Sequence, residues 1–457
     1  MVLLDEGHSY RGERSSPSAK EVEVDFNISL ARRSGFPFYT FQASFSSPVG
    51  LTDKCTRQTL RRMTQLEPPS GEALEGLART RAEQLVSWMG ERRLDHLLLG
   101  SADNIRYASD FRSLIINETA DHMLCLFDTD GRSAIYGPHL KEEVQEPGQP
   151  RLKALRPLTG WTPLMAEPLT VIRTIAEGLR QENARRVGYD SVSVMLLDGL
   201  RAELGDHTEF EYVGNALFDL RRVKLPAELD LMRLANADNL SALEDAFATI
   251  GPGSRDRDIL AAAVMAQESG RAELITHSTC NVHSAPWNWS AQNHVVTPPE
   301  SIFLDQCFYG LGGYASDITR TVFIGDPPDV VVEGYRNLVE VSEEIHSLAR
   351  TGARVSDLDE HMNRAFLQRG LAESPYGLGH GIGLRIMEPP SISPAHLLDS
   401  SRALVRGEVL AIEPETSVED NGVVYPLKVE DCFVVSDDGL VPLGPLPTTT
   451  LQTIDIT

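Results

Sequence analysis

The sequence lacks any run of about 18 apolar residues, the length that a helix needs to cross a bilayer. This absence excludes a protein anchored by membrane-spanning helices. Residues 1–5 also lack the order of basic, apolar and small residues that marks an export signal. We therefore predict a cytoplasmic protein with no membrane contact.

Basic residues are fewer than acidic residues in this chain. The chain carries 42 Lys and Arg against 66 Asp and Glu, which gives a formal net charge of −24. A surface that binds nucleic acid needs a concentrated basic face, because it must neutralise phosphates. No segment of the sequence has such a concentration, so we expect no nucleic-acid partner.

Cysteine is also scarce. The five cysteines are scattered through the 457 residues, and no two of them form a Cys-x-x-Cys pair. An odd number without that spacing indicates neither a disulfide framework nor a thiolate zinc site. We expect the cysteines to be reduced and mostly buried in the core.

The length of the chain predicts two packed domains and an additional segment. The N-terminal segment is rich in Ser, Pro and Arg, and it closes with the helix-breaking run PPSG at 68–71. We divide the sequence into an N-terminal extension at 1–78, an α/β domain at 79–220 and a second domain at 221–457.

Local patterns place helices and strands in both domains. The turn at 128–131 separates two strand-like runs and predicts a hairpin. The second domain is expected to begin with a long helix at Pro226, and Ser254 or Asp256 is the expected N-cap of the next helix. Further helices are predicted at 163–181, 192–204, 332–350 and 356–369, and strands and turns at 274–325.

Two aspartates lie on strand-like segments joined by a glycine-rich turn. Asp305 belongs to the run LDQCFY, and Asp317 belongs to GYASDITRT. A hairpin here would bring the two side chains face to face. Buried carboxylates repel each other unless a cation lies between them, so the pattern indicates a cation site. The alternative is that both aspartates cap turns.

Three further residues combine a polar group with apolar or glycine-rich surroundings. His380 lies between glycines in GLGHGIG, which lets the backbone approach closely and leaves the imidazole as the polar group. Glu413 and Glu430 each lie on an otherwise apolar strand-like segment, AIEPE and LKVED. A buried glutamate requires a compensating charge. Four carboxylates and one imidazole suit Mn²⁺, Fe²⁺, Co²⁺ or Zn²⁺, and their charge favours two ions over one.

The order Asp, Asp, His, Glu, Glu, together with the motifs GYASDITRT, GHGIG, AIEPE and KVED, resembles the pita-bread family of methionine aminopeptidases, Xaa-Pro aminopeptidases, prolidases and creatinases. Residues 104–111 and 220–233 resemble the creatinase-type N-terminal domain and its junction with the catalytic domain. The resemblance covers about 80–445. It implies an α+β fold, in which a pita-bread catalytic domain at 221–457 follows a creatinase-like α/β domain.

The resemblance also implies a role for each ligand. Asp305 would bind the first metal ion, Asp317 and Glu430 would bridge both ions, and His380 and Glu413 would complete the second site. Glu413 and His380 are the implied catalytic residues, with Glu413 as the proton shuttle. Relatives commonly dimerise, so we expect a homodimer.

The sequence departs from the peptidase pattern in ways that resemble a side branch of the family, the dimethylsulfoniopropionate lyases. Asp305 and Asp317 are 12 positions apart, whereas the peptidases usually space them by 11. Met387 replaces the second histidine of prolidases. The lyases, however, have aspartates at the positions of Cys307 and Ile386, and the second of these is their proposed base.

We predict a hydrolase that cleaves an amide C–N bond in a short peptide or another small molecule. The alternatives are a lyase acting on dimethylsulfoniopropionate and a non-catalytic binding protein with the same fold. Residues near the ligands are predicted to bind substrate, although core packing or a solvated turn is the other interpretation of each. They are Trp287, Tyr376, Arg385 and Glu388.

Overall fold

The computed structural model describes the backbone of residues 26–33, 36–43, 66–111, 123–138, 152–158, 167–271, 273–282, 293–393 and 402–456. The chain divides into two units, Met1–Lys54 and Cys55–Thr457. In the first unit, strands β1 (Phe26–Arg33) and β2 (Phe36–Ala43) form an antiparallel hairpin. The remaining elements all belong to the second unit.

The N-terminal domain contains a six-stranded mixed sheet in the order β6-β5-β4-β3-β7-β8. Its central strand β3 is buried along its whole length, as expected for a strand covered on both faces. The antiparallel pair β4 and β5 confirms the predicted hairpin. The strands are β3 (His96–Leu99), β4 (Leu124–Asp128), β5 (Ser133–Pro138), β6 (Leu152–Leu158), β7 (Arg186–Tyr189) and β8 (Glu209–Tyr212).

Helices of this domain pack on the sheet. The hydroxyl of Ser70 accepts a hydrogen bond from the backbone N–H of Ala73 and caps the first helix, which therefore begins within the predicted extension. The helices are α2 (Gly71–Arg92), α3 (Ala102–Ser109), α5 (Pro168–Gln181), α6 (Val194–Leu204) and α7 (Gly214–Arg221).

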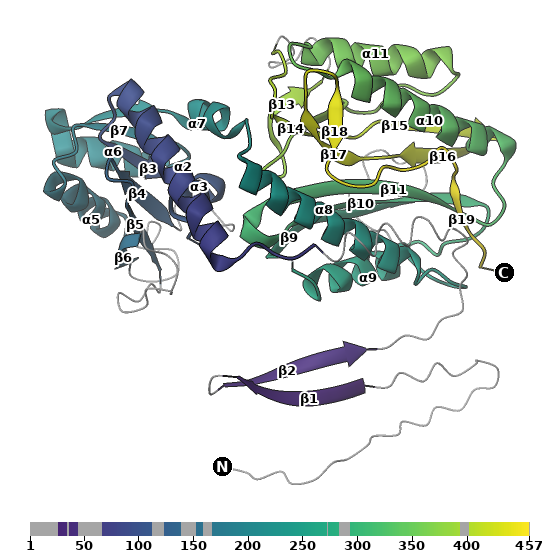
Figure 1. The fold of residues 1–457 in the computed structure, drawn as a ribbon, viewed down its shortest axis with the longest axis horizontal. Coiled ribbons are helices and arrows are strands. Elements are labelled where there is room, and N and C mark those ends of the chain that lie inside the picture. Colours follow the sequence, from purple (N-terminus) through teal and green to yellow (C-terminus); the bar gives the residue numbers. More distant parts are fainter. Residues whose placement is uncertain are drawn as a thin grey trace, which may run out of the picture. The chain divides into compact units, whose positions relative to one another are not determined.

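The C-terminal domain has two layers of helix around its sheets (Figure 1). One layer consists of two helices that pack on a four-stranded sheet in the order β19-β11-β10-β9. These elements are α8 (Pro226–Phe247), α9 (Asp256–Glu268), β9 (Leu274–Val282), β10 (Glu300–Tyr309), β11 (Ala315–Ile324) and β19 (Gln452–Ile454).

The other layer consists of two helices over a five-stranded sheet, in the order β13-β12-β14-β17-β18, and over the hairpin β15-β16. Hairpin strand β16 also contacts β10 and β11, which brings the two layers together. The elements are α10 (Asp329–Leu348), α11 (Val355–Gln368), β12 (Gly379–Gly381), β13 (Glu388–Ile392), β14 (Val409–Ile412), β15 (Glu415–Asp420), β16 (Val423–Lys428), β17 (Asp431–Val435) and β18 (Leu440–Pro442).

The α+β class and the helices predicted in this domain are confirmed, with one correction at a helix terminus. The residue that caps α9 is Arg255, and neither Ser254 nor Asp256 does so. The side chain of Asp258 accepts a hydrogen bond from the backbone N–H of Arg255, whereas the hydroxyl of Ser254 accepts one from Gly251 in the preceding turn. The hydroxyl of Ser254 therefore stabilises the preceding turn and does not cap the helix.

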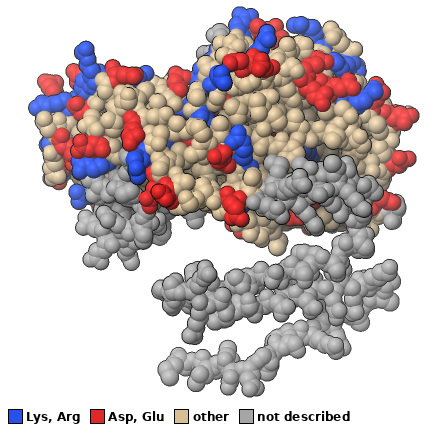
Figure 2. Space-filling view, in the orientation of Figure 1, with Lys and Arg blue, Asp and Glu red and all other residues tan. Residues whose placement is uncertain are grey.

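None of the helices in the described ranges is long and apolar enough to span a membrane. On the face drawn in Figure 2, the Lys and Arg side chains of the described residues lie in small groups among Asp and Glu.

Candidate metal centre

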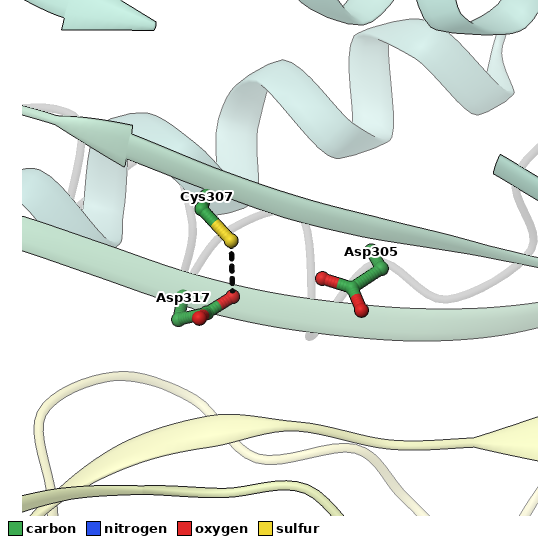
Figure 3. Close-up of side chains that lie close together, drawn as sticks. All are labelled: Asp305, Cys307 and Asp317. Atoms are coloured by element: carbon green, nitrogen blue, oxygen red, sulfur yellow. Dashed lines mark hydrogen bonds between the residues drawn. The ribbon is translucent and has the colours of Figure 1, made fainter. Parts of the chain in front are cut away.

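Strands β10 and β11 form a hairpin that carries the first part of the site. Asp305 and Cys307 are two residues apart on β10, so their side chains point to the same face of the sheet. The residue directly opposite Asp317 is Cys307, whereas Asp305 lies opposite Thr319. The expectation that the two aspartates face each other was therefore wrong, because Cys307 takes the position opposite Asp317. They are diagonal neighbours, and the thiol of Cys307 donates to Oδ1 of Asp317 at 2.9 Å (Figure 3).

His380 approaches the same carboxylates from β12. Its Nδ1 lies 2.9 Å from the carbonyl oxygen of Gly381. Because a carbonyl oxygen can only accept, Nδ1 carries the proton in this contact, and a neutral ring then presents the lone pair of Nε2. That atom is 3.6 Å from Oδ2 of Asp317 and 3.7 Å from Oε1 of Glu413. The imidazole is thus oriented as a ligand with a fixed tautomer.

The two glutamates lie at strand ends next to the hairpin. Glu413 follows β14, and its backbone N–H donates to the carbonyl of Leu378. Glu430 lies between β16 and β17 and forms a bridge with Thr319, whose hydroxyl donates to Oε2 of Glu430 at 2.8 Å. Backbone pairing and a side-chain hydrogen bond therefore hold Glu430 against the strand that carries Asp317.

Lys428 lies among these carboxylates, and it was not among the residues predicted for the site. Its ammonium is 2.6 Å from Oδ2 of Asp305, 2.9 Å from Oε2 of Glu413 and 3.3 Å from Oε2 of Glu430. The alternation of side chains along an extended segment, which places Lys428 two residues before Glu430, is the sequence signal that could have found it. The same signal applies to Cys307 beside Asp305 and to Glu415 beside Glu413.

Burial and mutual repulsion raise the pKa values of several of these acids. Burial first, and then the neighbouring carboxylate of Asp305, raise the pKa of Asp317 to about 7. Burial and Asp317 hold the pKa of Glu430 well above its ordinary value. Burial also raises the pKa of Glu415 to about 7, against the effect of Lys428. Ionisation of all of these carboxylates is therefore unfavourable unless a further cation compensates their charge.

The donor set fits divalent metal ions. Two groups of three residues have ligand atoms within 4.8 Å of one another, and Asp317 belongs to both. One group is Asp305, Cys307 and Asp317; the other is Asp317, His380 and Glu430. Within the described part of the chain, Oε1 of Glu430 is buried without a hydrogen-bond partner. A buried carboxylate oxygen in that position calls for a cation.

The residues predicted to bind substrate lie in three different settings. Tyr376 is half-buried, and burial followed by the charge of Glu415 raises the pKa of its phenol, which places it beside the cluster. Arg385 and Glu388 belong instead to an ion-pair network with the N-terminal domain and the domain junction. Trp287 lies outside the described residues.

In that network both carboxylate oxygens of Glu388 are occupied by basic groups. Oε1 accepts from Arg221 at 3.1 Å, and Oε2 accepts from Lys224 at 3.1 Å. Arg385 pairs with Asp103 of helix α3 at 3.0 Å, and Asp103 also pairs with Arg221 at 2.6 Å. The network thus joins α3 to the segment that follows His380.

Comparison with known proteins identifies two family models in the chain. Residues 81–223 match the Creatinase/Prolidase N-terminal domain, and residues 230–437 match Metallopeptidase family M24. An Xaa-Pro dipeptidase from Pyrococcus furiosus is 25% identical over 368 residues, which are 79% of this chain and 96% of that protein.

Two solved structures have the same fold. The X-Pro aminopeptidase of Thermotoga maritima has a TM-score of 0.68 at 21% identity, over 82% of this chain and 99% of that one. The prolidase of Pyrococcus horikoshii has a TM-score of 0.66 at 19% identity, over 81% and 100% of the two chains. The pita-bread fold and the creatinase-like N-terminal domain inferred from the sequence motifs are thereby confirmed.

Proposed function

The chain belongs to metallopeptidase family M24 and is a metal-dependent peptidase, and we propose that it cleaves the bond between an amino acid and a following proline in short peptides. The similarity to an Xaa-Pro dipeptidase and to solved prolidase and X-Pro aminopeptidase structures supports this substrate class. The observation that carries the proposal is the convergence of three carboxylates and one imidazole on Asp317.

The proposed centre holds two divalent ions, from among Mn²⁺, Fe²⁺, Co²⁺ and Zn²⁺. Asp317 is common to both groups of ligand atoms, which supports its role as a bridge, whereas Glu430, the other expected bridge, belongs to one of the two groups. Asp305 would bind the first ion, and His380 and Glu413 would bind the second. Bound ions of this kind lower the pKa of water and stabilise negative charge on a carbonyl oxygen.

Glu413 is the proposed proton carrier because it is the most accessible of the five ligands. Its side chain is 19% exposed, against 10% for His380 and 1% for Glu430. It can therefore meet both an attacking water and the leaving nitrogen, accepting a proton from the first and donating it to the second. The contact between His380 and the Gly381 carbonyl keeps the imidazole oriented during this transfer.

The proposal is tested with purified protein loaded with each candidate metal and assayed against Xaa-Pro and Xaa-Ala dipeptides. We expect turnover of Xaa-Pro peptides, and Glu413→Gln should reduce kcat by about 10²–10⁴-fold through loss of proton transfer. Glu419→Gln, an exposed change on β15, is the matched control and should retain activity. Absence of Xaa-Pro turnover with every metal would reject the substrate class.

The lyase alternative gains no support from the relatives described above, which are peptidases by name. Ile386, at the position of the proposed lyase base, is a buried apolar residue. Four points stay predictions: the role of Trp287, the homodimer, the cytoplasmic location, and the domain boundaries at 78 and 220.

A further inference from the structure

Cys307 is a buried thiol that the peptidase reaction described above does not use. We propose that Cys307 is a metal ligand: its thiolate joins Asp305 and Asp317 around one ion and creates a mixed sulfur and oxygen site. This inference rests on the proposed metal centre and deepens it, because it names a ligand outside the set of four carboxylates and one imidazole.

The strand geometry carries the inference. Cys307 and Asp305 project from the same face of β10, and the backbone pairing sets Cys307 directly across from Asp317 (Figure 3). The three ligand atoms lie within 4.8 Å of one another. One ion binds sulfur at about 2.3 Å and carboxylate oxygen at about 2.0–2.2 Å, so its ligand atoms lie roughly 3–4.5 Å apart. The 2.9 Å contact between Sγ and Oδ1 of Asp317 is close to the lower end of this range.

Cys432, a second buried cysteine of the same region, has the kind of contact expected for a residue that only packs. Sγ of Cys432 is 3.4 Å from the backbone carbonyl of Asp317, so its nearest polar partner is an uncharged peptide group. Cys307 instead points at the carboxylate of the same residue. Of these two buried thiols, therefore, Cys307 is the one directed at the atoms that would hold the ion.

The second group of ligand atoms supports the same role. Oε1 of Glu430 is buried without a hydrogen-bond partner among the described residues, and Glu430 shares Asp317 with the group that contains Cys307. A buried carboxylate oxygen in this position favours a cation next to Asp317, the residue that Cys307 contacts.

A thiolate changes which ions the site prefers. Thiolates favour Zn²⁺ and other thiophilic ions, whereas sites made of carboxylates and water suit Mn²⁺ and Mg²⁺. We therefore expect the wild-type protein to select Zn²⁺ or Co²⁺ over Mn²⁺ when the ions compete. Replacement of the sulfur by oxygen in Cys307→Asp should shift that preference towards Mn²⁺.

The test is the absorption spectrum of protein loaded with Co²⁺, which does not depend on catalysis. Cobalt bound by a thiolate has a charge-transfer band in the near ultraviolet, in addition to weak visible bands from the metal itself. We expect the charge-transfer band in wild-type protein and in Cys432→Ala, and its loss in Cys307→Asp and Cys307→Ser. Circular dichroism verifies that each variant is folded.

X-ray absorption of the wild-type protein loaded with Zn²⁺ gives a second readout that needs no variant. A zinc–sulfur distance of about 2.3 Å is expected beside shorter zinc–oxygen and zinc–nitrogen distances. Visible cobalt bands without a charge-transfer band, or a zinc spectrum without a sulfur shell, would overturn the role of Cys307 and leave the proposed peptidase intact. Failure to bind any metal would overturn both.

Discussion

At the scale of single residues, the site balances buried charges of opposite sign. Lys428 is 3% exposed, and its ammonium contacts three carboxylates of the proposed metal centre. Burial lowers the pKa of the ammonium, but Asp305 and Glu413 outweigh this effect and hold the pKa well above its ordinary value. Lys428 is thus positively charged, and it fixes the carboxylates in place before an ion arrives.

This role predicts that Lys428→Met harms the metal-free protein more than the metal-loaded one. Loss of one partner of a buried ion pair costs about 3–5 kcal/mol, because the remaining charges are left uncompensated. Divalent ions would supply the missing positive charge and reduce that loss. Urea unfolding in EDTA and in Mn²⁺ measures both values.

Lys224→Met is the control for this comparison, because Lys224 is a buried lysine paired with Glu388 in the ion-pair network. We expect it to lower stability by a similar amount in EDTA and in Mn²⁺. An equal loss of stability for Lys428→Met under the two conditions would show that Lys428 does not substitute for metal charge.

At the scale of the secondary-structure element, the short strand β12 positions His380, a proposed metal ligand. Gly379 precedes His380 and has φ of 156°, and a Cβ atom there would lie 2.1 Å from the carbonyl oxygen of Ala411 on β14. The strand can therefore approach β14 only with glycine at this position. Close pairing with β14 is what brings Nε2 of His380 to Asp317 and Glu413.

We predict that Gly379→Ala displaces β12 and weakens both folding and metal binding. Overpacking of this kind costs about 1–3 kcal/mol, and misplacement of the histidine should lower metal affinity by about 10–100-fold, as for changes that disturb ligand orientation. Gly76→Ala, in an open position on helix α2, should instead stabilise by about 0.5–1 kcal/mol. Urea unfolding and calorimetric titration with Co²⁺ measure the two effects, and unchanged metal affinity in Gly379→Ala would contradict the role of this strand.

Most elements could be predicted from the sequence, and the five proposed ligands could be singled out, because their signals are local. A polar residue in an apolar run predicts Asp305 or Glu430 as a site residue, and the turn at 128–131 predicts a hairpin. The pairing register could not be predicted, because the glycine-rich turn leaves open which residue faces Asp317. That uncertainty hid the contact with Cys307. The same limit applies to Glu388, whose partner Arg221 lies 167 residues away.

At the scale of the whole molecule, buried ion pairs join the N-terminal domain to the catalytic domain. Asp103 of α3 is bound by Arg221, which ends α7, and by Arg385 of the catalytic domain. Arg221 in turn contacts Glu388, and both are 3% exposed. Because Asp103, Arg221 and Glu388 are buried at a junction between domains, their pairing couples the folding of one domain to that of the other.

The pKa of Asp103 gives this coupling a defined pH dependence. Burial raises the pKa, but Arg221 and Arg385 outweigh burial and lower it to about 2 from 3.8. A lowered pKa means that the unfolded state binds more protons between those values, so the carboxylate stabilises the fold above about pH 4 and loses this contribution as the pH falls towards 2. The shift corresponds to about 2 kcal/mol at neutral pH.

We therefore predict that Asp103→Asn lowers the free energy of unfolding by at least about 2 kcal/mol at pH 7, and that its difference from wild type shrinks as the pH falls below about 4. Urea unfolding between pH 7 and 3 measures the difference directly. Asp357→Asn, which removes an exposed ion pair with Arg354, is the control and should change stability little at any pH. A difference for Asp103→Asn that stays constant down to pH 3 would mean that Asp103 joins the domains through packing and hydrogen bonds, and that its charge contributes nothing.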